Sequence, residues 1–251
     1  MITTVMFDMG GTLEAIYSDE ESKQKSAEVL LDMLKSYGLD PGVDAVTLRA
    51  ALADGWVRYG NYRDATDIEL KPVNIWCDYV LTDYDFPREA LAPHCEEIAH
   101  MWEVTYYHRT LRPGVARMLE GLKSLGLKIG IISNTAALFQ VFDVLEDYGI
   151  RDYMDDVTLS SVTGIRKPCV DIFTVSMRQL QSKPEECVYV GDTISRDVIG
   201  PRRAGIAKTI QIYSKLTAEK DSGRVYEFAP DYVVPEIYDV YPVLKEILGK
   251  A

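Results

Sequence analysis

Near the N-terminus the sequence reads TVMFDMGGTL, at residues 4–13. Residues 4–7 form an apolar run with the length of a short buried strand, and the run ends at Asp8. Gly10 and Gly11 follow almost at once and indicate a tight turn. In open α/β sheets ligands bind beyond the carboxyl ends of the strands, so Asp8 stands where a functional residue is expected.

Apolar strands with polar residues at their ends recur in the second half of the chain. The run KIGII at 128–132 precedes Ser133, and CVYV at 187–190 precedes Gly191 and Asp192. Shorter strands are expected near 156–160, at 209–212 and at 232–234, with helices near 115–125, 136–147, 169–181, 195–204 and 236–248. Strands that are apolar throughout and alternate with helices predict an α/β fold with a doubly wound parallel sheet.

A long helical segment interrupts this alternation directly after the first strand and shows no convincing strand of its own. Its helices are expected from about Ser18 to Gly38 and near 44–58, 71–82 and 87–108. Ser18 and Glu21 have the spacing of a capping box at the start of the first helix. We therefore expect an α/β core domain of residues 1–13 and 112–251, with an all-helical domain of residues 14–111 inserted into it.

The composition is typical of a globular protein with a strongly acidic charge. Of 251 residues, 27 are Lys or Arg and 39 are Asp or Glu, so the net charge is −12. Such a chain is repelled by nucleic acid and by anionic membrane surfaces, and no apolar run approaches the roughly 18 residues of a membrane helix. The N-terminus lacks the basic and apolar regions of a signal peptide, so a cytoplasmic protein is expected. Residues 214–229 are expected to form an exposed, mobile loop.

The rule for ligand sites in α/β sheets brings the residues at the ends of the three main strands to one edge. These residues are Asp8, Ser133 and Asp192. The other polar candidates near the strand ends are Thr12, Asn134, Lys167 and Asp197. The spacing of Asp192 and Asp197 alone is weak evidence, because other aspartate pairs of this acidic chain have the same spacing. Position is the stronger argument, since Asp192 follows a glycine at the end of a buried strand.

Four segments together resemble the motifs of the haloacid dehalogenase (HAD) superfamily. They are FDMGGTL at 7–13, similar to D-x-D-G-T-L; IISN at 131–134, with a serine ending a strand; RKP at 166–168, with a lysine beside a helix start; and GDTISRD at 191–197, similar to G-D-x-x-x-x-D. Their order and approximate separations match, and the inserted helices resemble the family's cap domain. The resemblance covers essentially the whole chain and implies a Rossmann-like α/β core with an inserted helical cap.

The resemblance implies a hydrolase that works through a covalent aspartyl phosphate. Asp8 would be the nucleophile that attacks phosphorus. A carboxylate that attacks a phosphate dianion meets charge repulsion, which a hard cation such as Mg²⁺ neutralises. By resemblance, Asp8 and Asp192 would hold that ion, with Asp197 as a direct or indirect partner. Gly10 would offer the ion only its backbone carbonyl.

The same resemblance assigns the groups that bind the phosphoryl oxygens. Ser133 and Lys167 would contact these oxygens, and Lys167 would also damp the repulsion between Asp8 and the substrate. Asn134 and Thr12 would be supporting donors, although a threonine at such a turn is also a common structural cap. The expected function is therefore a Mg²⁺-dependent phosphatase that acts on a small phosphorylated metabolite.

One position departs from the family's pattern. The family's phosphatases carry a second aspartate two residues after the nucleophile, which protonates the leaving group and then activates water, and this chain has Gly10 there. Loss of a general acid and base typically costs about 10²–10⁴ in rate. Glu14 is the nearest acidic replacement, but a solvated hinge residue is the favoured interpretation of it.

Two alternatives stay open because of Gly10. A phosphonatase-like enzyme that cleaves a C–P bond has a small residue at this position and needs a cap lysine for a Schiff base. The lysines of the inserted segment are Lys23, Lys25, Lys35 and Lys71, for which exposed helix positions are the favoured interpretation. The second alternative is a catalytically weak module that binds phosphate esters. A metal-free dehalogenase is disfavoured, because that branch does not keep the acidic pair of Asp192 and Asp197.

The inserted segment also holds many aromatic residues, including all three tryptophans, Trp56, Trp76 and Trp102. We expect these aromatics to form the core of the insertion rather than a substrate pocket. Arg63 lies in an expected loop, where a solvated side chain is favoured over contact with an anionic group of a substrate.

Overall fold

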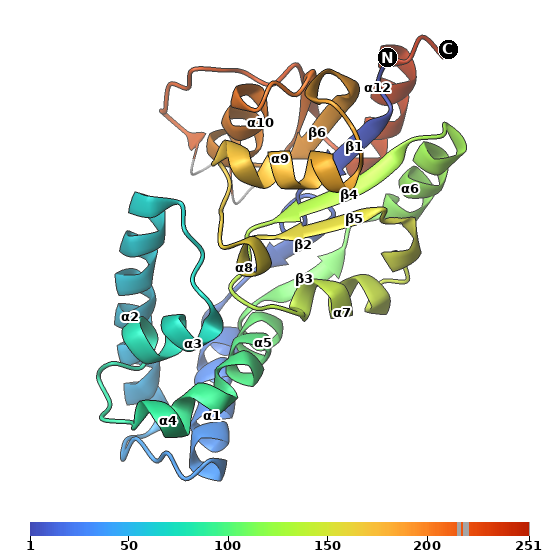
Figure 1. Ribbon diagram of the computed structural model, residues 1–251. Coiled ribbons are helices and arrows are strands. Elements are labelled where there is room, and N and C mark those ends of the chain that lie inside the picture. Colours follow the sequence, from blue (N-terminus) through green and yellow to red (C-terminus); the bar gives the residue numbers. More distant parts are fainter. Residues whose placement is uncertain (215–216, 218–220, 251) are drawn as a thin grey trace.

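The computed structural model describes residues 1–214, 217 and 221–250. Its centre is a six-stranded parallel sheet in the order β5-β4-β1-β6-β7-β8 (Figure 1). The strands are β1 (Thr4–Phe7), β4 (Lys128–Ser133), β5 (Asp156–Leu159), β6 (Cys187–Gly191), β7 (Lys208–Ile212) and β8 (Tyr232–Val234). The predicted α/β class is confirmed, and each strand predicted for the core is present.

Helices cover both faces of this sheet, as its wholly apolar strands require. The core helices are α6 (Val115–Ser124), α7 (Gln140–Asp147), α8 (Ser160–Thr163), α9 (Val170–Gln179), α10 (Ile199–Arg203) and α12 (Val240–Ile247). Val5 and Phe7 of β1 belong to a hydrophobic core shared with α6 and α12, whereas Met6 packs with α9 on the opposite face. Strand β1 is therefore buried on both sides, and the strand order reverses between β1 and β6.

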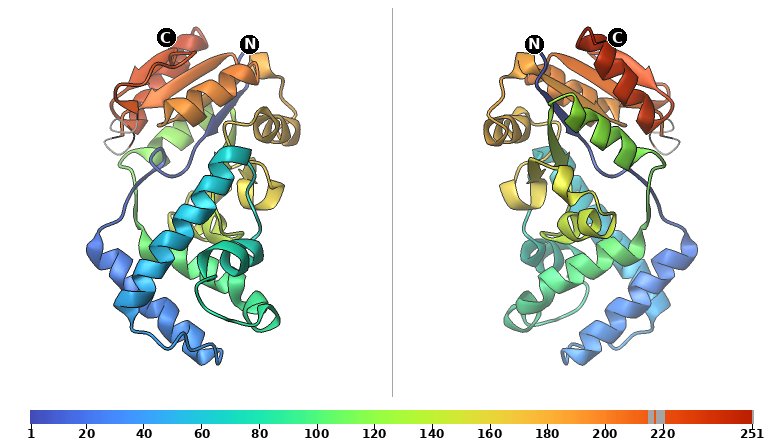
Figure 2. Two further views of the ribbon diagram at one scale, coloured as in Figure 1. Left: turned by 90° about the vertical axis from the view of Figure 1, so that its left-hand side faces the viewer. Right: turned by 90° about the vertical axis from the view of Figure 1, so that its right-hand side faces the viewer.

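The helical insertion after β1 is confirmed. Its helices form a group of their own, apart from the sheet and the helices that cover it (Figures 1 and 2). Its helices are α1 (Glu20–Ser36), α2 (Ala45–Thr66), α3 (Pro72–Ile75), α4 (Arg88–Leu91) and α5 (Cys95–Tyr106), and a π-helical turn, Trp76–Val80, prolongs α3. The insertion has its own hydrophobic core around the fully buried side chains of Trp76 and Tyr59. Most of its aromatic residues therefore have the packing role that was expected.

The prediction that residues 14–111 contain no strand is wrong at both ends of that segment. Strand β2 (Glu14–Tyr17) pairs antiparallel with β3 (His108–Leu111), and the two form a ribbon where the chain leaves and re-enters the core. The partners are about 90 residues apart in sequence, so no local pattern marks the pairing. The division into two domains at 13/14 and 111/112 stays a prediction.

Several helix ends differ from the prediction. Helix α1 is capped by Asp19, which exchanges hydrogen bonds with Ser22, so the capping box predicted at Ser18 and Glu21 is wrong. Helix α2 runs to Thr66, well beyond the predicted end near residue 58. The predicted helix near 195–204 begins as a π-helical turn before α10.

The predicted mobile loop at 214–229 falls partly outside the described residues. Residues 215, 216 and 218–220 are not among them, and residues 222–229 contain neither helix nor strand. Within the described part of the chain, no helix is both long enough and apolar enough to cross a membrane.

Candidate active site

Three buried aspartates meet where the two central strands end. Asp8 follows β1 directly, and Asp192 follows β6. Asp197 lies one turn further on, in the π-helical turn Ile194–Val198. Each aspartate offers one carboxylate oxygen, and these oxygens lie within 4.8 Å of one another. The structure thus brings together the three carboxylates that the sequence placed in one candidate metal site. We call them the aspartate cluster.

Two glycines allow these carboxylates to come so close. Gly11 has a φ of +90°, and a Cβ added to it would lie 2.1 Å from Oδ2 of Asp192. Gly191 ends β6, and a Cβ there would lie 2.3 Å from the Cβ of Asp197. Carbon atoms do not approach other side chains this closely, so a side chain at either position would displace an aspartate.

We expect Gly11→Ala to destabilise the protein and to disturb the aspartate cluster. A non-glycine residue in this backbone region costs about 1–3 kcal/mol, and the collision with Asp192 adds to that cost. Gly10→Ala is the matched control, because the φ of Gly10 is not left-handed and the nearest atom to an added Cβ is Cδ1 of Ile16 at 3.7 Å. Urea unfolding measures the difference, and equal midpoints for the two variants would contradict this account of the turn.

Lys167 joins two members of the aspartate cluster. Its Nζ donates hydrogen bonds to Oδ1 of Asp8 and to Oδ1 of Asp197, both at 2.7 Å, and to the hydroxyl of Tyr189 at 2.9 Å. Burial raises the pKa of Tyr189 far above its usual value, so the phenol stays protonated. The sequence analysis missed Tyr189, because it is one residue of a wholly apolar strand and nothing in the local pattern sets its hydroxyl apart.

Asn134, in the loop after β4, holds the backbone of Lys167. The side-chain amide of Asn134 accepts a hydrogen bond from the backbone N–H of Lys167 at 2.9 Å and donates one to its carbonyl at 3.1 Å. The amide of Asn134 is thus engaged with the backbone of Lys167. The hydroxyl of Thr12 donates to Oδ2 of Asp8 at 3.4 Å. Ser133, the last residue of β4, is nearly buried and lines a cavity that Asp8 also lines.

The three carboxylates of the aspartate cluster outnumber the two cationic side chains that lie near them. Burial raises the pKa of Asp8, against the opposing effect of Lys167. Burial, and then the neighbouring Asp8 and Asp197, raise the pKa of Asp192 to about 7. The nearby cations are Lys167 and Arg196, and the sequence analysis did not single out Arg196. Three carboxylates and two cations leave room for a further positive charge, and oxygen is the ligand atom that Mg²⁺ prefers, so the residues present fit this ion.

Glu14 is fully buried, so its interpretation as a solvated hinge residue is wrong. Its carboxylate accepts hydrogen bonds from Arg109 of β3 and, at 3.0 Å, from the hydroxyl of Tyr148. Burial raises the pKa of Glu14. A Cβ added to Gly10 would lie 3.8 Å from Oε1 of Glu14. Glu14 therefore lies beside the position of the missing aspartate, while Arg109 and Tyr148 hold its two oxygens.

A cavity of about 660 Å³ lies between the aspartate cluster and the helical insertion. The core contributes Asp8, Ser133 and Lys167, and the insertion contributes the aromatic residues Trp56, Trp102, Tyr106 and Tyr107. Some of the aromatics thus line the site as well as the core of the insertion. Arg63 also lines the cavity and belongs to α2, so its prediction as a loop residue is wrong.

Comparison with known proteins shows which family this chain is similar to. The family model for haloacid dehalogenase-like hydrolases matches residues 2–205. The glyceraldehyde 3-phosphate phosphatase of Methanopyrus kandleri is 25% identical over 252 residues, which cover 98% of this chain and 99% of the relative. The protein of the same name from Methanocaldococcus jannaschii is 23% identical, with 98% of this chain and 99% of the relative covered.

Solved structures share the fold along the whole chain. A 2-haloacid dehalogenase from Pseudomonas syringae has a TM-score of 0.68 at 20% identity, and the match covers 98% of this chain and 100% of that one. An HAD phosphatase from Thermococcus onnurineus has a TM-score of 0.61 at 23% identity and covers 99% of both chains. At these identities the likeness concerns the fold, which a dehalogenase and a phosphatase have in common.

Proposed function

This chain belongs to the haloacid dehalogenase-like hydrolase family, and on that premise we propose that it is a Mg²⁺-dependent phosphatase of small phosphorylated metabolites. The observation that carries the proposal is the aspartate cluster, held around Lys167 at one end of a cavity. A buried carboxylate nucleophile, a site for a divalent cation and a buried ammonium group are the parts that phosphoryl transfer requires.

Asp8 is the proposed nucleophile. One of its carboxylate oxygens forms a bond to phosphorus while the bond from phosphorus to the alcohol oxygen of the substrate breaks, which leaves the phosphoryl group on Asp8. The alcohol leaves as an alkoxide, which takes a proton from water. Another water molecule then attacks the same phosphorus and gives up a proton while the bond to Asp8 breaks, which releases inorganic phosphate and restores the free carboxylate. Lys167 and Thr12 hold the two oxygens of Asp8 by hydrogen bonds, which fixes the orientation of the carboxylate before attack.

The remaining site residues are proposed to bind the metal ion or to stabilise the negative charge of the phosphoryl group. The groups that would hold Mg²⁺ are Asp8, Asp192, Asp197 and the backbone carbonyl of Gly10. When bound, the ion supplies positive charge against the repulsion between a carboxylate and a phosphate dianion. Lys167 and the hydroxyl of Ser133 are proposed to donate hydrogen bonds to the oxygens of the phosphoryl group during its transfer. Asn134 keeps the backbone of Lys167 in place for this task.

The cavity favours compact anionic substrates. The described residues that line it include seven basic and three acidic side chains, in a chain with a net charge of −12. Six of these basic side chains are paired with carboxylates, so an anionic substrate is proposed to be bound by Lys167 and the bound cation rather than by an excess of free positive charge. The volume of about 660 Å³ is in the range of small-molecule sites. Two relatives carry the name glyceraldehyde 3-phosphate phosphatase, so we propose triose and other short sugar phosphates as the first substrates to test.

No observation favours the phosphonatase alternative. Of the four lysines in the insertion, Lys23 is the one that lines the cavity. Its Nζ donates to Glu20 at 3.0 Å, and this hydrogen bond raises the pKa of Lys23. A lysine that forms a Schiff base needs the opposite shift, since its neutral amine is the nucleophile.

The proposal predicts that the purified protein releases inorganic phosphate from small phosphate monoesters in the presence of Mg²⁺. EDTA is expected to abolish the release, and excess Mg²⁺ is expected to restore it. A colorimetric phosphate assay over a panel of sugar phosphates measures this, with glyceraldehyde 3-phosphate included. The Asp8→Asn protein, prepared in the same way, controls for contaminating phosphatases. No release from any ester, or a release that EDTA leaves unchanged, would contradict the proposal.

A further inference from the structure

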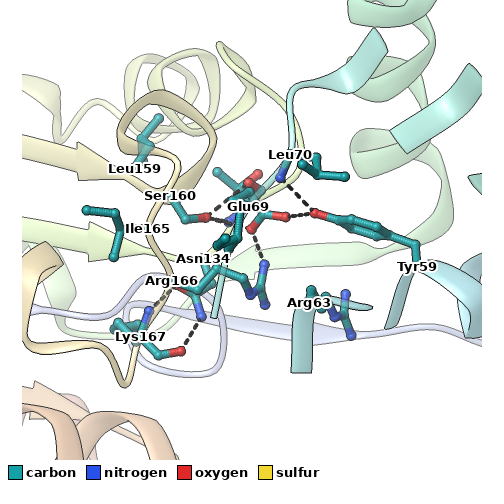
Figure 3. Close-up of polar contacts among 12 residues, drawn as sticks. Tyr59, Arg63, Glu69, Leu70, Asn134, Leu159, Ser160, Ile165, Arg166 and Lys167 are labelled. Carbon is teal, nitrogen blue, oxygen red and sulfur yellow. Dashed lines mark hydrogen bonds and ion pairs between the residues drawn. The ribbon is translucent and has the colours of Figure 1, made fainter. Parts of the chain in front are cut away.

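We infer that Glu69, which belongs to the helical insertion, is a positioning residue that couples docking of the insertion on the core to the placement of Lys167. The inference rests on the proposed function for its catalytic part. Figure 3 shows Glu69 between Ser160 and Arg166 of the core and Tyr59 of the insertion. We call these four residues the Glu69 latch.

The carboxylate of Glu69 is inaccessible to solvent and fully satisfied by its neighbours. It forms an ion pair with Arg166, whose side chain is 10% exposed. It also accepts hydrogen bonds from the hydroxyl of Ser160, at 2.7 Å, and from the hydroxyl of Tyr59. A buried carboxylate without its cation is strongly unfavourable, so Glu69 and Arg166 each depend on the other.

Backbone hydrogen bonds join the same two segments. Ile68 and Ile165 form an antiparallel β-bridge. The N–H of Glu69 donates to the carbonyl of Gly164 at 3.0 Å, and the N–H of Arg166 donates to the carbonyl of Asp67 at 2.9 Å. The segment between α2 and α3 is thus joined by a single β-bridge to the core loop that leads into Lys167.

The latch reaches both loops that carry the proposed phosphoryl-binding groups. Arg166 is the residue directly before Lys167. Ser160, which donates to Glu69, accepts a hydrogen bond from the backbone N–H of Thr135 at 2.9 Å. Thr135 directly follows Asn134, whose amide holds the backbone of Lys167. One carboxylate of the insertion therefore braces the loop of Lys167 and the loop after β4 together.

This arrangement gives docking of the insertion a consequence for catalysis. With the insertion docked, Glu69 neutralises Arg166 and holds the loop that presents Lys167. If these contacts were broken, Arg166 would lose its counter-charge and the loop would lose its two backbone hydrogen bonds. The contacts of Glu69 thus hold the loop of Lys167 in the position that the proposed reaction requires.

The test compares Glu69→Gln with Asp83→Asn. The first change keeps the shape of residue 69 but removes its charge, and the second removes the carboxylate of an exposed ion pair with Arg58 within the insertion, at 2.8 Å. Hydrogen exchange of the backbone amides of residues 69 and 166 reports docking. In Glu69→Gln we expect these two amides to exchange at least about tenfold faster, with the amides of β1 unchanged. We expect kcat for p-nitrophenyl phosphate with Mg²⁺ to fall about 5- to 150-fold, the range of coupling between sites. Asp83→Asn is expected to match the wild-type protein in both measurements.

Each other outcome overturns the inference. Unchanged exchange at residues 69 and 166, or an unchanged kcat, would show that docking and catalysis are not coupled through Glu69. Faster exchange throughout β1 would show a general loss of stability. If Glu69→Gln does not fold, Ser160→Ala is used instead, because it removes one hydroxyl of the latch. The same increase in hydrogen exchange and the same fall in kcat are then expected. A wild-type protein without phosphatase activity would refute the proposed function, whereas the exchange measurement would still test the latch.

Discussion

Replacing Asp8 by asparagine is expected to abolish phosphate release while the fold stays intact. The amide has nearly the shape of the carboxylate and still accepts a hydrogen bond from Lys167, but it cannot attack phosphorus. Loss of the nucleophile in a covalent mechanism costs about 10³-fold or more in rate. Burial raises the pKa of Asp8, which means that its charged form is costly in the folded protein, so removing the charge is not expected to lower stability.

The matched control for this variant is Asp147→Asn. Asp147 is exposed at the end of α7, away from the aspartate cluster, and its loss is expected to leave the rate within about twofold of wild type, as is usual for surface positions. Steady-state phosphate release and thermal unfolding of both variants measure the two halves of the prediction. Activity of Asp8→Asn within a few-fold of wild type would remove the basis for the mechanism.

Because Gly10 replaces the usual acid, the rate of phosphate ester hydrolysis is expected to depend steeply on the leaving group. Aryl phosphates leave as weakly basic phenolates and need little help. Alkyl phosphates leave as strongly basic alkoxides and need a proton that Gly10 cannot supply. Without a general acid, alkyl esters are expected to react about 10²–10⁴ times more slowly than they would with one. Glu14 lies next to this position, but Arg109 and Tyr148 hold its oxygens.

Gly10→Asp is expected to accelerate the hydrolysis of alkyl phosphates most. The difference in rate between aryl and alkyl phosphates should therefore become smaller. The structure accommodates this change, because the φ of Gly10 is not left-handed and an added Cβ makes only ordinary contacts. The new carboxyl would lie beside Glu14, and two neighbouring carboxyls favour protonation of one of them, which suits a general acid. Rates for aryl and alkyl phosphates in both proteins measure the effect. A flat dependence in the wild-type protein would show that another acid already protonates the leaving group.

The core of the fold and the aspartate cluster could be predicted because their signals are local. Each central strand is apolar throughout, and a parallel sheet aligns the strand ends, so Asp8 and Asp192 had to lie near each other. Gly191 directly precedes Asp192 and Gly11 follows Asp8 by three residues, and the close approach of the carboxylates explains why both are glycines.

The buried ion pairs could not be predicted, because their partners lie far apart in the chain. Glu14 was interpreted as solvated because its cation, Arg109, lies 95 residues away on β3. The pair of Glu69 and Arg166 spans 97 residues and joins the insertion to the core. Each of these residues looks like an ordinary surface charge in its local sequence. Their burial follows from how the insertion folds back on the sheet, which no periodicity in the sequence encodes.

The most direct test of the account is to find the phosphoryl group on Asp8. The wild-type protein is mixed with p-nitrophenyl phosphate and Mg²⁺, stopped with acid during turnover and treated with borohydride, which reduces an aspartyl phosphate to homoserine. Peptide mass spectrometry then locates the modified residue. Homoserine is expected at position 8 and nowhere else. Phosphate release with Asp8 unmodified, or with another residue modified, would contradict this expectation.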